Sequence, residues 1–79
     1  MKDRSIRRNL YRVLRKLGIP RSFINENVRL DGDLLLDAWD RDCFLFYVED
    51  TFGLRLSAAD ARQMSTVGSA ISFLGRRLA

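Results

Sequence analysis

The sequence contains no histidine, and its only cysteine is Cys43. A zinc site, a serine–histidine or cysteine–histidine nucleophile pair and an internal disulfide are therefore excluded, which removes most classes of enzyme. No segment has the length and hydrophobicity needed to span a bilayer, and the basic N-terminus is not followed by the apolar run of a signal peptide. We therefore expect a cytoplasmic protein that holds no metal.

Proline is also scarce, with one residue in the chain, whereas apolar residues make up 47%. This composition is typical of an ordered globular chain, and the lack of alternating apolar and polar runs indicates that it is all helical. A chain of 79 residues can build one modest core, because folding at this size buries only roughly 60–65% of the surface of the unfolded chain. We expect one domain over residues 1–79 and a monomer.

Charge is distributed unevenly along the chain. Residues 1–29 carry nine basic and two acidic residues, and residues 30–50 carry one basic and seven acidic residues. Residues 51–79 carry four basic residues and one acidic residue. The three segments sum to +7, −6 and +3, which gives the net charge of +4. The charge is therefore segregated by structural element, as expected when different faces meet different partners.

The first helix is predicted over residues 5–17, because apolar residues recur there at i, i+4, i+7, i+8 and i+11. They are Ile6, Leu10, Val13, Leu14 and Leu17. The positions between them form a basic outer face of Arg7, Arg8, Arg12, Arg15 and Lys16. Such a face would also suit nucleic acid or an anionic membrane surface, although a solvated surface is the commoner reason for it. Gly18 and Pro20 end the helix.

Residues 18–36 form a long connection that we expect to be an ordered crossover with a short turn at residues 21–24. Apolar anchors would hold it across the bundle: Ile19, Phe23, Ile24, Val28, Leu30 and Leu34. A crossover of this length allows the first two long helices to pack in a geometry that a tight turn would forbid.

The central helix is expected within residues 34–52. Asp37 is placed to cap it, Asp40 and Asp42 add negative charge where the helix dipole is positive, and Gly53 ends it. One apolar stripe consists of Phe44, Leu45, Val48 and Phe52, and a second of Trp39, Cys43, Phe46 and Tyr47. A helix that is apolar on two stripes either lies at the centre of its bundle or keeps one stripe for a partner.

Two further helices are predicted after Gly53. Ser57 and Asp60 match a capping box that starts a short helix ending near Met64. Ser65 or Thr66 then caps a last helix, whose apolar positions are Val67, Ala70, Ile71, Leu74 and Leu78. The fold class is therefore an all-α bundle of three main helices and one short helix.

This order of elements resembles the acyl carrier protein family over about residues 6–74. Residues 30–40, LDGDLLLDAWD, are similar to the family signature Leu-x-x-Asp-Leu-Gly-x-Asp-Ser-Leu-Asp. Residues 48–53, VEDTFG, resemble its acidic helix end, and residues 64–67, MSTV, resemble its entry to the last helix. The resemblance implies an acyl-carrier-type bundle with a long crossover between its first two helices.

The sequence departs from the family at the residue that matters most for chemistry. In the family the serine after the second aspartate of the signature carries 4′-phosphopantetheine, which a separate transferase attaches from coenzyme A. Ala38 stands at that position, Leu35 replaces the glycine and Trp39 replaces the leucine that follows. Because a methyl group cannot attack phosphorus, we expect no cofactor on this sequence. Cys43 is not a substitute, since its apolar neighbours favour an inert thiol.

Two explanations for Ala38 remain open: a serine replaced on purpose to keep a true carrier unmodified, or a carrier-like protein that has lost its attachment site. The changes at Leu35 and Trp39 favour the second. In either case the resemblance implies a protein that is not itself an enzyme. It implies contact with the basic patches of enzymes of fatty-acid or polyketide biosynthesis. The expected contact residues are Asp37, Trp39, Asp40, Asp42, Glu49 and Asp50, with Cys43, Phe46 and Tyr47 as the apolar centre. The alternative function is a nucleic-acid or anionic-surface binder that uses the basic first helix.

Overall fold

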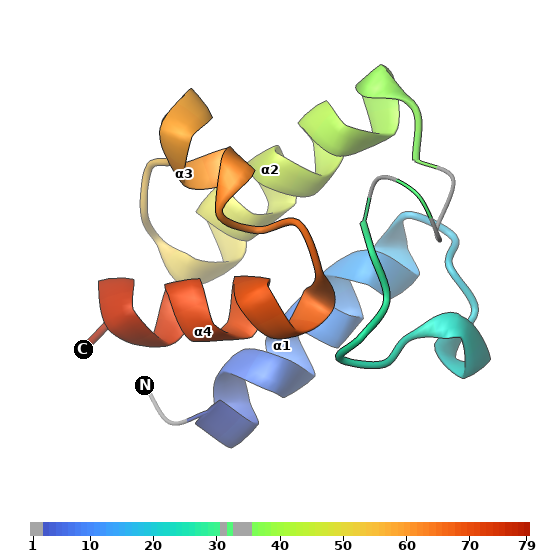
Figure 1. The fold of residues 1–79 in the computed structure, drawn as a ribbon, viewed down its shortest axis with the longest axis horizontal. Helices are drawn as coiled ribbons and strands as arrows, with labels where there is room; N and C mark the ends of the chain where they lie inside the picture. Colours follow the sequence, from blue (N-terminus) through green and yellow to red (C-terminus); the bar gives the residue numbers. More distant parts are fainter. Residues whose placement is uncertain (1–2, 31, 33–35) are drawn as a thin grey trace.

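The computed structural model describes residues 3–30, 32 and 36–79, and these residues form a bundle of helices (Figure 1). The α-helices are α1 (Asp3–Lys16), α2 (Ala38–Phe52), α3 (Ala58–Arg62) and α4 (Val67–Arg77), with a 3-10 helix η1 (Arg21–Phe23) in the crossover. Within the described ranges no β-strand forms, apart from an isolated bridge between Arg29 and Thr66. The prediction of three main helices and one short helix is confirmed.

Helix α1 packs against both α2 and α4. Its predicted apolar face is buried: Ile6, Leu10, Val13 and Leu14 are all at most 1% exposed. The same core contains Phe44, Val48 and Phe52 of α2, and Val67, Ala70, Ile71, Phe73 and Leu74 of α4. One buried side per helix, joined in one cluster, is what holds a domain of this size together.

The ends of the helices follow the signals in the sequence. Gly18 (φ +88°) and Gly53 (φ +65°) adopt the left-handed conformation that ends α1 and α2. Ser57 accepts a hydrogen bond from the backbone N–H of Asp60, and the Asp60 carboxylate accepts one from the N–H of Ser57, so the predicted capping box is present. Of the two candidates for the last cap, the structure uses Thr66, which accepts from the N–H of Ser69.

Asp60 also joins α3 to α4. Besides capping α3, its carboxylate accepts a hydrogen bond from the Arg77 guanidinium at 3.0 Å. The backbone hydrogen bond from Ser57 and the bond from Arg77 both favour the ionised form, so they lower the pKa of Asp60 below its ordinary value of 3.8. Arg77 donates a second bond to the backbone carbonyl of Arg55, which holds the segment between α2 and α3 against the end of α4.

Backbone hydrogen bonds fasten the crossover to the start of α4. The N–H of Leu30 donates to the Ser65 carbonyl at 2.9 Å. In the opposite direction, the N–H of Val67 donates to the Val28 carbonyl at 3.0 Å, and the N–H of Gly68 donates to the Glu26 carbonyl at 2.8 Å. A Cβ atom at Gly68 would lie 3.0 Å from the Glu26 carbonyl oxygen, so only glycine allows this approach without displacement. Glu26 also forms an ion pair with Arg7 of α1. The predicted ordered crossover is thus confirmed over its described part.

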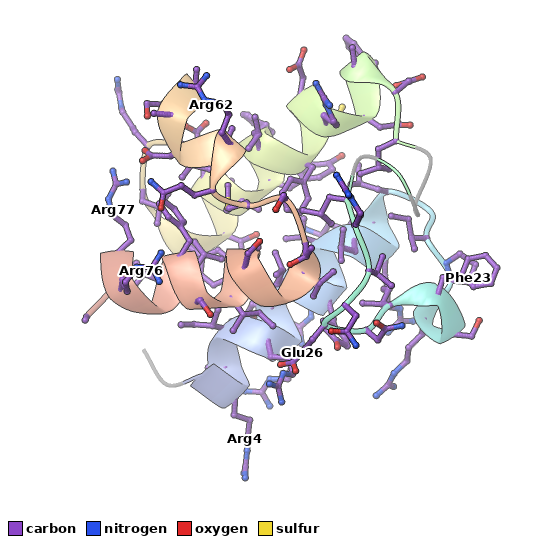
Figure 2. The ribbon with its side chains drawn as sticks, in the orientation of Figure 1. Arg4, Phe23, Glu26, Arg62, Arg76 and Arg77 are labelled. Carbon is purple, nitrogen blue, oxygen red and sulfur yellow. The ribbon has the colours of Figure 1, made fainter. Side chains whose placement is uncertain are left out.

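One predicted anchor of the crossover is wrong. Ile19, Ile24 and Leu30 are buried as expected, but Phe23 is 62% exposed, and Figure 2 shows it pointing away from the helices. Phe23 is the last residue of η1, and the backbone becomes extended at the next residue, Ile24, whose side chain is 7% exposed and belongs to the core. Leu34, the last predicted anchor, lies outside the described residues, as do Asp33 and Leu35 of the signature.

Candidate functional site

The N-terminus of α2 is built by Asp37, as predicted. Its Oδ1 atom accepts a hydrogen bond from the backbone N–H of Asp40 at 2.8 Å, which satisfies one of the free donors of the first turn. Ala38 is the first residue of the helix, and its side chain is exposed. The position that follows the cap is therefore accessible from solvent, but it offers only a methyl group.

The two apolar stripes of α2 have different environments. Phe44, Val48 and Phe52 point into the core and are at most 7% exposed. On the opposite side of the helix Trp39 is 73% exposed and Phe46 is 63% exposed, with the half-buried Cys43 between them. The structure thus exposes two aromatic residues, Trp39 and Phe46, that the sequence analysis named among the expected contact residues.

Acidic residues lie along the same helix, but they do not all face solvent freely. Asp42 and Asp50 are exposed, and Asp40 is half-buried. Glu49 is half-buried as well, and its Oε2 atom accepts a hydrogen bond from the backbone N–H of Leu56 at 2.7 Å. Glu49 therefore holds the segment after α2, whereas Asp42 and Asp50 are available for contact.

Tyr47 lies at the border between the exposed face and the core. It is half-buried and packs against the core, its ring centroid lies 6.1 Å from that of Phe46, and the Lys16 Nζ atom lies 5.6 Å above its ring. A cation at this distance is attracted to the electron-rich face of the ring. Tyr47 consequently belongs to the contact between α1 and α2 and supports Phe46 from one side.

A cavity of about 300 Å³ opens beside α2, and the sequence analysis missed it. Its lining comes from the end of the crossover, α2, α3 and the residues before α4: Leu30, Leu36, Arg41, Asp42, Phe44, Leu45, Ala61, Arg62, Met64 and Ser65. A cavity of this size and apolar character can enclose a small apolar group. No single stretch of sequence marks it, because four segments must be assembled before it exists.

Comparison with known proteins decides the family. No protein-family model matches the chain. An acyl carrier protein of Chlamydia caviae is 32% identical over 65 residues, which cover 82% of this chain and 84% of the relative. An acyl carrier protein of Thermotoga maritima is 32% identical over 66 residues, which cover 84% of this chain and 82% of the relative. One of Chlamydia felis is 31% identical over 65 residues, which cover 82% of this chain and 83% of the relative. The chain belongs to the acyl carrier protein family. Acyl carrier proteins are carriers rather than enzymes, and so this chain is not an enzyme.

Acyl carrier proteins normally bear 4′-phosphopantetheine and interact with biosynthetic enzymes. The residues of this chain do not fit the prosthetic group at the expected place. The first residue of α2 is accessible, but Ala38 has no oxygen with which to form a phosphodiester. Asp37 and Asp40 beside it are joined to each other by the cap. The helix and its aspartate cap are therefore present, and the residue that follows the cap is an alanine. No helix among the described residues has the length and apolar character to cross a membrane.

Proposed function

We propose that this protein acts as a carrier-like docking module that binds enzymes of fatty-acid or polyketide biosynthesis through α2 and bears no 4′-phosphopantetheine. The observation that carries the proposal is the exposure of Trp39 and Phe46, at 73% and 63%, on a helix whose first residue has no hydroxyl group. We further propose that it works as a monomeric single domain of residues 1–79 in the cytoplasm.

The chemistry of the exposed face supports this function. Large aromatic side chains supply most of the binding energy at protein interfaces when they enter a pocket of the partner. Asp42 and Asp50, exposed on the same helix, would favour a partner with a basic docking patch and accelerate its approach. The proposed docking face therefore consists of Trp39, Asp42, Phe46 and Asp50. Asp37 and Glu49 contribute by shaping the ends of the helix.

The aromatic part of the face is tested by titrating the protein against a purified fatty-acid biosynthesis enzyme that has a basic docking patch. Trp39→Ala combined with Phe46→Ala should weaken binding by tenfold or more, since a hot-spot residue contributes about 2 kcal/mol or more. Phe23→Ala is the matched control, because Phe23 is equally exposed but lies on η1. Equal losses in the double variant and in the control would argue against α2 as the docking face.

The charge of the face is tested separately. Asp42→Lys with Asp50→Lys should abolish steering of a basic enzyme and lower the association rate, most strongly at low salt. The matched variant is Arg8→Glu with Arg12→Glu, which reverses two exposed charges of α1 and should leave binding of the enzyme intact. Loss of binding only in the arginine variant would contradict the proposal.

The missing attachment site is tested with coenzyme A and a broad-specificity phosphopantetheinyl transferase. The mass of the protein should not change, because Ala38 offers no nucleophile. Any increase in mass would contradict this interpretation of the site. The Ala38→Ser variant then separates the two explanations: prompt modification favours a carrier whose serine was replaced, and continued resistance favours a lineage that has diverged at Leu35 and Trp39.

A further inference from the structure

A second surface lies on the outer side of α1 and plays no part in the docking function proposed for α2. It is a groove of about 390 Å³ whose lining consists of six arginines and one tyrosine: Arg4, Arg7, Arg8, Tyr11, Arg12, Arg15 and Arg21. All come from α1 except Arg21, which η1 contributes. The fold of the crossover thus adds a wall to a basic helix face and makes it concave.

The arginines form an ordered row along the helix. Arg4, Arg8, Arg12 and Arg15 are spaced by four, four and three residues, so they follow one side of α1 over about 16 Å at a rise of 1.5 Å per residue. Among the described residues only Arg7 of the six has an ion-pair partner, Glu26. The lining contains no lysine, and guanidinium groups differ from ammonium groups in binding phosphate with two parallel hydrogen bonds.

Tyr11 gives the groove a second kind of contact. Its ring is half-buried against the core, which holds it in place, and part of it lines the groove between the arginines. Proteins that bind single-stranded nucleic acid combine these two features: cationic side chains follow the backbone and an aromatic ring stacks on a base. The neighbouring Lys16 is not part of the groove, since it lies over the Tyr47 ring of α2.

The burial of α1 argues against a membrane as the ligand. An amphipathic helix binds a bilayer by inserting its apolar face among the lipids. The apolar face of α1 is at most 1% exposed and is committed to the core, so no apolar side remains for insertion. A concave surface also suits a thin chain better than the flat surface of a bilayer.

We propose that the arginine groove of α1 and η1 binds a single strand of nucleic acid, with its phosphates on the guanidinium groups and a base on the Tyr11 ring. Binding depends little on sequence, because every base has a face that can stack. The groove would engage about four phosphates, which predicts a slope near −2.8 for the logarithm of affinity against the logarithm of salt. Affinity then falls ~50-fold between about 50 and 200 mM salt.

The test measures the fluorescence anisotropy of labelled oligouridylate and oligothymidylate of about 12 nucleotides, which is within the site sizes of known single-strand-binding folds. Arg8→Gln with Arg12→Gln should weaken binding and reduce the salt slope to about half, because two of about four phosphate contacts are removed. The matched control is Arg62→Gln with Arg76→Gln, which changes net charge equally on α3 and α4 and should leave the slope unchanged (Figure 2).

Two further variants address the geometry of the groove. Arg8→Lys with Arg12→Lys keeps the charge and should retain the slope, while losing affinity because the forked contacts are gone. Tyr11→Leu should weaken binding about fivefold or more, and Tyr11→Phe should not, because only the ring is needed for stacking. Circular dichroism and a thermal melt of each variant establish that the helices are intact.

Three results would overturn the proposal. One is equal affinity for a duplex of the same length, and another is an equal loss in the Arg62 and Arg76 control. The third is binding to vesicles containing phosphatidylserine, or self-association at low salt, in place of binding to the oligonucleotides. Equal affinity for a duplex would mean that the arginines attract any polyanion. An equal loss in the control would mean that the net charge of the protein, and not the groove, governs binding. Binding to vesicles, or self-association, would identify an anionic membrane or the acidic α2 of another copy as the ligand.

Discussion

The helices α1 and α2 have nearly the same length, 14 and 15 residues, but they use their apolar residues differently. In α1 the apolar residues form one stripe, that stripe is buried, and the opposite surface is basic. In α2 they form two stripes, of which one is buried and the other carries Trp39 and Phe46 into solvent. An apolar stripe therefore identifies the buried face of a helix without ambiguity only when that helix has one apolar stripe.

The reason for this difference lies in the number of neighbours that each helix has. Among the described residues, α1 packs extensively against both α2 and α4, whereas α2 has an extensive helix contact only with α1. A helix with one such neighbour can cover one stripe. The second stripe of α2 remains at the surface, and so a pattern that would be central in a larger protein becomes a candidate interface in this one.

The two stripes of α2 can be compared directly through two phenylalanines. Phe44→Ala should lower the free energy of unfolding by about 3–5 kcal/mol, because a ring that is only 3% exposed is replaced by a cavity. Phe46→Ala should change it by less than about 0.5 kcal/mol, since its ring is already largely in water. Urea denaturation followed by circular dichroism measures both values. Similar losses would show that the exposed stripe is also required for folding.

The acids of α2 offer a comparison with a smaller expected effect. Glu49→Ala should lower the free energy of unfolding by about 1–2 kcal/mol, because the half-buried N–H of Leu56 loses its charged acceptor. Asp50→Ala, at the next position, removes an exposed charge and should cost about 0.5 kcal/mol or less. The same denaturation experiment separates them. An equal cost at both positions would mean that Glu49 belongs with the surface charges.

The smallest effect is expected from Asp60, a structural acid outside α2. Its pKa is lowered in the folded protein, so the ionised carboxylate stabilises the fold above about pH 4, and this stabilisation is lost as the pH falls through the folded-state pKa. The difference in stability between the parent and Asp60→Asn should therefore shrink as the pH decreases from neutrality below that range. Urea denaturation across this range measures it, and a difference that stays constant would show that the charge of Asp60 contributes nothing.

Local features of the fold could be predicted from the sequence because they depend on neighbours in the chain. The cap at Asp37, the capping box of Ser57 and Asp60 and the left-handed Gly18 and Gly53 each require only a few adjacent residues. The buried face of α1 could be predicted for a similar reason, since one apolar stripe leaves one choice. The absence of an attachment oxygen at position 38 was equally evident.

The sequence by itself determined the order of the helices and most of the residues that cap them, which face of α1 is buried and that Ala38 cannot carry a phosphodiester, although α1 begins two residues earlier and α3 ends two residues sooner than expected. Only the tertiary structure decided that Tyr47 packs against α1, that Glu49 holds Leu56, that Phe23 lies outside the core and that Arg21 completes a groove on α1. The physical reason is that capping and periodicity act within one or two helical turns. Exposure instead depends on which segments, distant in the chain, come to cover a side chain.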